Sequence, residues 1–138
     1  MNTKIVSIAA LLMLVGILSG FHQTAPPENT QIKKGMIKVT ILYPNGGGKR
    51  FDMDYYSNKH MPMIASLLGD SLKLYEIDKG IAGRNPTDPI PYLAIGYLYF
   101  DRLSAFQNSF RPYAEKIRGD VLNYTDIQPV VQISEVLR

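Results

Sequence analysis

The stretch YLAIGYLYF, residues 92–100, consists of apolar and aromatic residues around one glycine and carries no charge. A short run of this kind, rich in aromatic side chains, is typical of a strand that is buried on both faces. Pro91 and Asp101 bound the run. We therefore predict a central strand at residues 92–100, with helices on one face and a further layer needed over the other.

Two further strands are expected on the N-terminal side of this stretch. Residues 36–44, MIKVTILYP, alternate apolar with polar side chains, which is the period of a half-buried strand, and Pro44 with the glycines that follow ends it. Residues 71–80, SLKLYEIDKG, show a similar pattern. The loop that follows contains Pro86, Pro89 and Pro91, which exclude regular structure up to the central strand.

One helix is expected after the first strand and another after the central strand. In FDMDYYSNKHMP, residues 51–62, Asp52 can cap a helix through its carboxylate. Pro62 removes a backbone donor, so we predict a kink or a short break at residues 60–62, and Gly69 ends the helix. The second helix begins near Asp101, carries apolar residues at helical spacing and bends at Pro112. The apolar positions are Leu103, Phe106, Phe110, Tyr113 and Ile117.

A last strand is predicted within residues 125–136, TDIQPVVQISEV, which completes the order β-α-β-β-α-β. This order is typical of the ferredoxin-like arrangement, an α+β fold in which a four-stranded antiparallel sheet carries two helices on one face. The other face would expose the aromatic strand 92–100. We expect a homodimer through the sheet faces to cover it, which makes a dimeric α+β barrel.

The first 35 residues do not fit this domain. Residues 1–20 carry one basic residue, Lys4, before an apolar run shorter than the roughly 20 residues of a membrane span, which is the layout of a secretory signal peptide. An uncleaved membrane anchor is the alternative. Residues 21–35 are polar and predict a flexible tether. We therefore expect an exported protein, periplasmic or extracellular, whose domain is residues 36–138 and which leaves the membrane after signal cleavage.

Composition excludes several kinds of site. The chain has no cysteine, so disulfides, thiolate nucleophiles and cysteine-bound metals are excluded. A net charge of +3 without a dense basic run gives no reason to expect a nucleic-acid partner. Of its two histidines, only His60 lies in the domain, which is a poor match to a zinc or non-haem iron site. No glycine motif with dinucleotide spacing follows a strand, so we expect no metal and no cofactor, although a lone histidine can ligate haem.

Three segments resemble one protein family. Residues 51–62 resemble the EthD-family signature F-D-x-x-Y-Y-x-x-x-H-x-P, and AFQNSF, residues 105–110, resembles its A-F-Q segment. Residues 119–136 are similar to its closing D-x-x-N-Y-T-x-x-x-P-x-x-Q-x-S-x-V. The matches occur in the expected order over the whole domain. The resemblance implies a dimeric α+β barrel and the family's broad label, EthD-family reductases, which are proteins linked to ethyl tert-butyl ether degradation.

The first helix carries the best candidates for chemistry. Asp52, Tyr56 and His60 are spaced by four and are expected along one helical stripe. We predict His60 as a general acid or base, because imidazole titrates near neutrality. Tyr56 and Tyr124 can donate a hydrogen bond to a carbonyl or a developing oxyanion, which makes these three the predicted catalytic residues. The predicted substrate-binding residues are Tyr55, Gln107 and Gln132.

Each of these residues also has a structural explanation. Asp52 can serve only as a helix cap, and the tyrosines as core aromatics with a hydroxyl in water. His60 can bond a carbonyl freed by the break at Pro62. Tyr124, with Asn123, can shape the turn into the last strand. The aromatic strand is more simply a dimer core than a cofactor site.

Three kinds of function remain open on the sequence. The first is an exported enzyme, oxidoreductase-type or cofactor-independent, that acts on a small hydrophobic, carbonyl-bearing or aromatic molecule in a cleft between sheet and helices, with His60 as acid or base. The second is a non-catalytic barrel in which the same cleft only binds the ligand. The third is a purely structural dimeric module.

Overall fold

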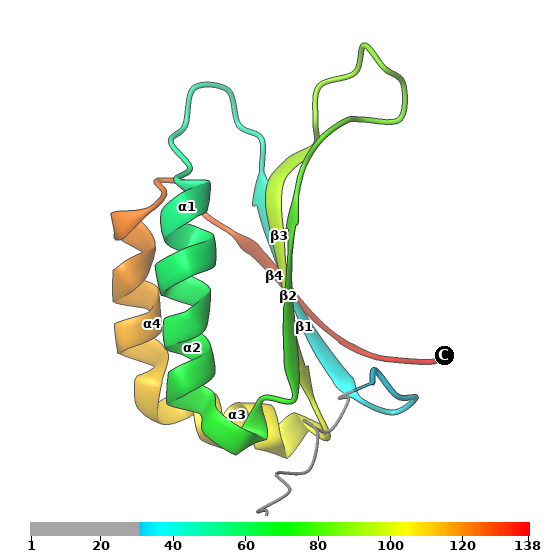
Figure 1. Ribbon diagram of the computed structural model, residues 1–138, viewed down its shortest axis with the longest axis vertical. Coiled ribbons are helices and arrows are strands. Elements are labelled where there is room, and N and C mark those ends of the chain that lie inside the picture. Colours follow the sequence, from blue (N-terminus) through cyan, green and yellow to red (C-terminus); the bar gives the residue numbers. More distant parts are fainter. Residues whose placement is uncertain (1–30) are drawn as a thin grey trace, which may run out of the picture.

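The computed structural model describes residues 31–138, so the predicted signal peptide and most of the predicted tether lie outside the described residues. Within them, one antiparallel sheet carries helices on a single face (Figure 1). The strands are β1 Ile37–Pro44, β2 Leu74–Lys79, β3 Tyr92–Phe100 and β4 Val130–Glu135. The helices are α1 Met53–Tyr55, α2 Met61–Leu68, α3 Leu103–Phe110 and α4 Ala114–Asp120. No helix in this part of the chain is long and apolar enough to cross a bilayer.

The sheet has the strand order β2-β3-β1-β4, with β3 paired to both β1 and β2. The predicted element order, the ferredoxin-like arrangement and the central position of residues 92–100 are confirmed. Val39 lies directly opposite Leu98 on one side and Ile133 on the other. Because paired residues of neighbouring strands point to the same face, this register sorts the strand residues into an inner face toward the helices and an outer face.

The first helical segment is continuous but changes its winding. Asp52 caps α1 as predicted, since its carboxylate accepts a hydrogen bond from the Tyr55 amide at 2.9 Å. A π-helical turn, Tyr56–His60, separates α1 from α2 and lies just before residues 60–62, where the kink or short break was predicted. From Met61 onward the segment is α-helical. Pro62 lies in the first turn of α2, where its missing N–H is tolerated. Gly69, at a φ of 52°, ends the helix as predicted.

The second helical segment begins at Leu103 and is bent by a 3₁₀ turn at Arg111–Tyr113, which contains Pro112. The predicted bend is therefore confirmed. The turn also changes the phase of the helix, because a 3₁₀ turn has fewer residues per turn than an α-helix. Tyr113, in this turn, and Leu103, the first residue of α3, remain 38% and 42% exposed, although the apolar spacing placed both on the buried stripe.

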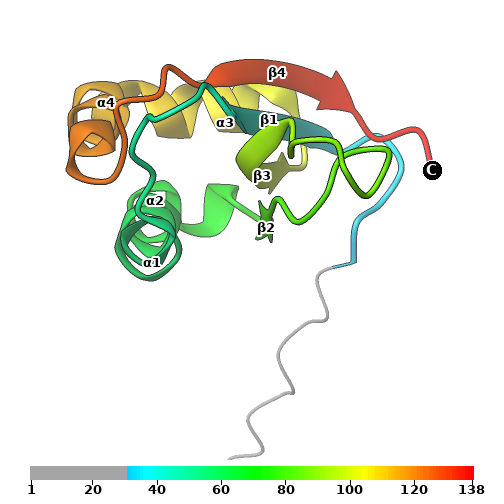
Figure 2. The same cartoon turned by 90° about the horizontal axis from the view of Figure 1, so that it is seen from above.

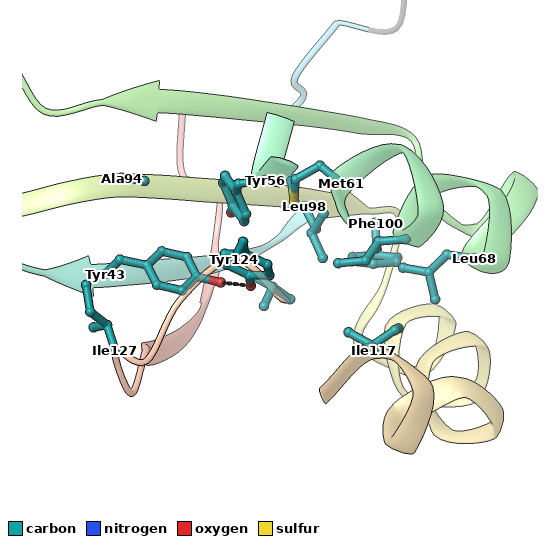
Figure 3. Packing of buried hydrophobic residues seen from close by; sticks show 12 residues of the cluster. Tyr43, Tyr56, Met61, Leu68, Ala94, Leu98, Phe100, Ile117, Tyr124 and Ile127 are labelled. Carbon is teal, nitrogen blue, oxygen red and sulfur yellow. Dashed lines mark hydrogen bonds between the residues drawn. The ribbon is translucent and has the colours of Figure 1, made fainter. Parts of the chain in front are cut away.

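The core lies between the inner face of the sheet and the helices (Figure 3). Residues of β1 and β3 pack there against α2, the π-helical turn and α4. The buried residues from the strands are Val39, Tyr43, Ala94, Leu98 and Phe100, and those from the helical segments include Tyr56, Met61, Ile64, Leu68 and Ile117. Each large apolar side chain buried in this way contributes roughly 1.5–3 kcal/mol, so this layer fixes how the helices sit on the sheet.

The outer face carries no helix (Figure 2). Two tyrosines of β3 lie on it, and each donates its hydroxyl to a carboxylate of β2: Tyr97 to Asp78 at 3.0 Å and Tyr99 to Glu76 at 2.8 Å. Lys38 of β1 places its ammonium 5.7 Å from the centre of the Tyr97 ring. Asp78, Glu76 and Lys38 thus each interact with a tyrosine of β3 across the strands.

Candidate functional site

The start of the first helical segment and the end of the second are bound side by side. The Arg50 guanidinium donates to the carbonyls of Leu122 and Asn123 at 2.8 and 3.1 Å. In return, the Thr125 hydroxyl donates to the Arg50 carbonyl at 2.7 Å, and the Asp52 amide donates to the Tyr124 carbonyl at 2.7 Å. These bonds bring the segment FDMDYYSNKHMP next to the segment that follows α4.

His60 and Asp120 meet at this junction. His60 Nδ1 lies 2.7 Å from Asp120 Oδ2, and the histidine is only 3% exposed. Asp120 also accepts from the Tyr55 hydroxyl at 3.0 Å and from the Asn123 amide at 2.8 Å. Because a carboxylate at the last residue of a helix faces the negative end of the helix dipole, these donors are needed to hold it there. Nδ1 of His60 is engaged by Asp120, so Nε2 is the ring nitrogen that can take part in another hydrogen bond.

Burial and hydrogen bonding set the charge state of this pair. Burial lowers the pKa of His60 below its ordinary value of 6.5, and Asp120 offsets only part of this effect. For Asp120, burial raises the pKa, but the hydrogen bonds from His60, Asn123 and Tyr55 outweigh burial and lower it below 3.8. Near neutral pH the pair is therefore a neutral imidazole beside an ionised carboxylate. An ionised carboxylate only accepts, so Nδ1 carries the proton and Nε2 carries the lone pair.

Aromatic rings surround the imidazole on its inner side. The His60 ring centre is 4.6 Å from that of Tyr124 and 5.7 Å from that of Tyr56. The Tyr124 hydroxyl is hydrogen-bonded to the Tyr43 hydroxyl at 2.7 Å (Figure 3), whereas the Tyr56 hydroxyl has no partner among the described residues. Burial raises the pKa of both Tyr56 and Tyr124, so these hydroxyls stay protonated and can only act as neutral donors or acceptors.

The structure brings together four of the predicted site residues: His60, Tyr56, Tyr124 and Tyr55. Tyr55 reaches the cluster through Asp120, and Lys59 lies 5.1 Å from the centre of its ring on the outside. Asp52, which was predicted on the same stripe as Tyr56, is exposed at the cap. Its structural explanation is confirmed.

The two predicted glutamines lie elsewhere. Gln107 is exposed on α3, and Gln132 is exposed on β4, opposite Thr40 on the outer face. Neither takes part in the hydrogen bonds or ring contacts of the cluster in residues 31–138. They were chosen for their amide chemistry alone, and the fold gives them no common site with His60.

Sequence reasoning assigned no role to Asp120 or Tyr43. Asp120 opens the D-x-x-N-Y-T segment of the family resemblance, and its position in a quoted motif is the signal that could have found it. Tyr43 stands at the end of an apolar stripe, where nothing distinguishes it from a core residue. Asn123 was expected to shape a turn, and its side chain in addition binds Asp120 and Tyr55.

The predicted cleft between sheet and helices is filled by the core side chains drawn in Figure 3. The structure shows an open hollow at a different place, at the end of the β2–β3 hairpin, with Ile77, Lys79, Ile81, Tyr92 and Ile95 among its lining residues. Within residues 31–138 there is no group of three or more histidine, cysteine, aspartate or glutamate side chains that could hold a metal ion.

Comparisons with known proteins agree with this description. A family model for the EthD domain matches residues 48–128, which is more than half of the chain. A solved structure of an EthD-like protein from Ralstonia eutropha is 40% identical, with a TM-score of 0.73 over 77% of this chain and 96% of that chain. An ethyl tert-butyl ether D (EthD) family protein from Bacillus halodurans is 19% identical, with a TM-score of 0.58 over 74% of this chain and 99% of that chain.

A more distant structure shares the fold. A DABB family protein with a ferredoxin-like fold from Mesorhizobium loti has a TM-score of 0.50 at 12% identity, over 76% of this chain and 100% of that chain. No curated protein matches this chain.

Proposed function

The chain belongs to the EthD family, and we propose that it is a cofactor-independent acid-base enzyme in which His60 moves a proton of a small carbonyl-bearing or aromatic molecule. The observation that carries the proposal is the 2.7 Å contact between His60 Nδ1 and Asp120 Oδ2, made by an imidazole that is 3% exposed. A buried histidine kept neutral beside an ionised carboxylate is in the state that general-base catalysis requires.

Asp120 is a positioning residue in this proposal. It fixes the tautomer of His60, so that Nε2 carries the lone pair that accepts a proton. Nε2 takes the proton from a carbon next to the carbonyl, the electron pair of that C–H bond forms a C=C bond, and the π pair of the C=O bond moves to the oxygen. Return of the proton from Nε2 to the carbon restores the ketone, and its transfer to the oxygen gives the enol. The hydroxyls of Tyr56 and Tyr124 supply hydrogen-bond donors to the oxygen that becomes an enolate.

The test is the exchange of such hydrogens with deuterium, followed by proton NMR in D₂O on a panel of small aryl ketones that begins with acetophenone. We expect the protein to accelerate exchange and His60→Gln to reduce the acceleration by about 10²- to 10⁴-fold with an unchanged circular dichroism spectrum. Asp120→Asn reduces the rate and shifts its pH profile, because the carboxylate sets both the orientation and the pKa of His60. Tyr113→Phe, which changes an exposed phenol outside the cluster, is the control and keeps the full rate.

Equal exchange with and without His60, or no exchange in the unmodified protein, contradicts the acid-base function. A second candidate then follows from the close aromatic packing around His60, a non-catalytic barrel that only binds a small ligand. An oxidoreductase-type reaction at the same site, as the family label implies, would instead show substrate-dependent consumption of an added nicotinamide or flavin cofactor.

We further propose that the protein is a homodimer through the outer faces of its sheets. The support is that helices cover only the inner face (Figure 2), and that Tyr97 and Tyr99 of the apolar strand β3 bind the β2 carboxylates on the outer face. Light scattering tests this, and a monomer at micromolar concentration contradicts it.

We also propose that the protein is exported, on the basis of residues 1–20. The test is the mass of the protein recovered outside the cytoplasm, which is smaller than that of the full chain if the signal peptide has been cleaved.

A further inference from the structure

Three buried hydroxyl groups meet on the inner side of His60. They belong to Tyr43 of β1, Tyr56 of the π-helical turn and Tyr124 of the segment after α4, whose exposed fractions are 2%, 1% and 0%. Their rings contact one another edge to face or tilted, with centres 5.2 to 6.0 Å apart. Residues far apart in the sequence are thus gathered around one point in the interior (Figure 3).

The three hydroxyls do not all have hydrogen-bond partners among residues 31–138. Each phenol has one proton to donate. The Tyr43 and Tyr124 hydroxyls share one hydrogen bond at 2.7 Å, which uses one of their two protons whichever of them donates. The Tyr56 hydroxyl makes no hydrogen bond with the described residues. Two O–H donors therefore have no protein acceptor, although buried hydroxyls are nearly always paired.

A glycine in β3 makes room for the unpaired Tyr56 hydroxyl. Gly96 lies on the inner face in the middle of β3, and a Cβ atom at this position would overlap with the Tyr56 hydroxyl oxygen. A glycine in the interior of a strand weakens the strand. A phenylalanine at position 56 would need neither the glycine nor a hydrogen-bond partner. Stability alone would favour that replacement, so the fold by itself does not account for the hydroxyl.

We propose that Tyr43, Tyr56 and Tyr124 form a binding site for one electron-rich oxygen of a planar ligand: a phenolate, an enolate or a polarised carbonyl. Two convergent O–H donors in a buried setting match such an oxygen, in the manner of an oxyanion hole. The rings of Phe51 and His60 pack directly against the trio, so a ligand must displace one of these rings to reach the hydroxyls. The role of His60 in this site rests on the proposed function. The hydrogen-bond donors themselves depend only on the three tyrosines.

The experiment compares two probes of the same shape, para-nitrophenol and para-nitrotoluene, by titration at a pH where the free phenol is largely ionised. We expect the unmodified protein to prefer the phenolate, and Tyr56→Phe to lose about tenfold to a hundredfold of affinity for it, because one hydrogen bond to a charged oxygen is removed. Binding of para-nitrotoluene changes little. The Tm of Tyr56→Phe stays the same or rises, and Tyr43→Phe weakens phenolate binding as well. Tyr113→Phe is the matched control.

Three results would overturn the site: no preference for the phenolate in the unmodified protein, full phenolate affinity in Tyr56→Phe, or failure of Tyr56→Phe to fold. The last would mean that the hydroxyl is structural. This measurement needs no turnover. Phenolate binding without deuterium exchange refutes the acid-base function and leaves the site standing, whereas exchange without phenolate preference refutes only the site.

Discussion

Tyrosines on the two faces of the same sheet differ in how their hydroxyls are used. On the outer face, Tyr97 and Tyr99 each donate to a carboxylate of the neighbouring strand. On the inner side, Tyr43, Tyr56 and Tyr124 share a single hydrogen bond. The outer hydroxyls are satisfied by the fold itself, and the inner ones are not.

This difference shows where a function should be sought in a protein rich in tyrosine. Burial and the nearby carboxylates raise the pKa of Tyr99, so its phenol is a permanent donor to Glu76 and has nothing left to give a ligand. The inner hydroxyls are also permanently protonated, because burial raises their pKa, but two of their protons are free. Residue type alone does not distinguish the two sets of tyrosines, whereas the unused hydrogen-bonding capacity of the inner set points to the proposed site.

The largest effect is expected from adding a methyl group where the inner hydroxyl lies against β3. Gly96→Ala should lower the free energy of unfolding by about 1–3 kcal/mol, because its Cβ meets the Tyr56 hydroxyl and the backbone of a paired strand cannot move away. Adding Tyr56→Phe should restore most of the loss, since the nearest remaining ring atom is then 3.5 Å away, an ordinary contact. Urea unfolding of the single and double variants measures both effects.

Gly119→Ala is the control for this pair, because nothing lies within 4 Å of its Cβ position in α4. It should be neutral or stabilising, as alanine is the better helix former. Equal stability of Gly96→Ala and the unmodified protein, or no recovery in the double variant, would show that Tyr56 does not lie against β3 as described.

A smaller effect is expected from pH, because it concerns one titrating group whose partner offsets part of its burial. The folded pKa of His60 lies below the unfolded value of 6.5, so the unfolded chain takes up the proton first as pH falls. Stability should therefore be fully present above pH 6.5 and decline as the pH falls from there through the folded pKa. His60→Gln should remove this decline. A second decline, as pH falls below 3.8, belongs to Asp120, whose folded pKa is also lowered. An increase in stability as the pH is lowered from neutrality to the folded pKa of His60 would contradict the assigned charge state.

The smallest effect on the site is expected at the helix cap. Asp52→Ala should cost about 1 kcal/mol of stability, because the Tyr55 amide loses its acceptor, and should leave ligand binding unchanged. Asp54→Ala, which removes an exposed bond to Asn58 and a carboxylate in the first turn of α1, is the control and should cost less. Loss of phenolate binding in a folded Asp52→Ala protein would show that Asp52 contributes to the site and contradict this prediction.

The fold could be predicted because its determinants are local. The alternation in residues 36–44, the apolar run 92–100 and the cap at Asp52 each identify an element from neighbouring residues. The partner of His60 could not be found in this way, because Asp120 is 60 positions away and is brought close by the bonds of Arg50 and Thr125. The π-helical turn was not predicted either, because the sequence signal for an irregularity was Pro62, which pointed to residues 60–62 and not to Tyr56–His60.

The central claim is that the inner hydroxyls are held for a ligand and the outer ones for the fold. Urea unfolding of Tyr56→Phe and Tyr99→Phe, measured side by side, tests it most directly. We predict that Tyr99→Phe loses about 1 kcal/mol, because a hydrogen bond to Glu76 is removed, while Tyr56→Phe is as stable as the unmodified protein or more stable. A loss in Tyr56→Phe that equals or exceeds the loss in Tyr99→Phe would contradict the claim.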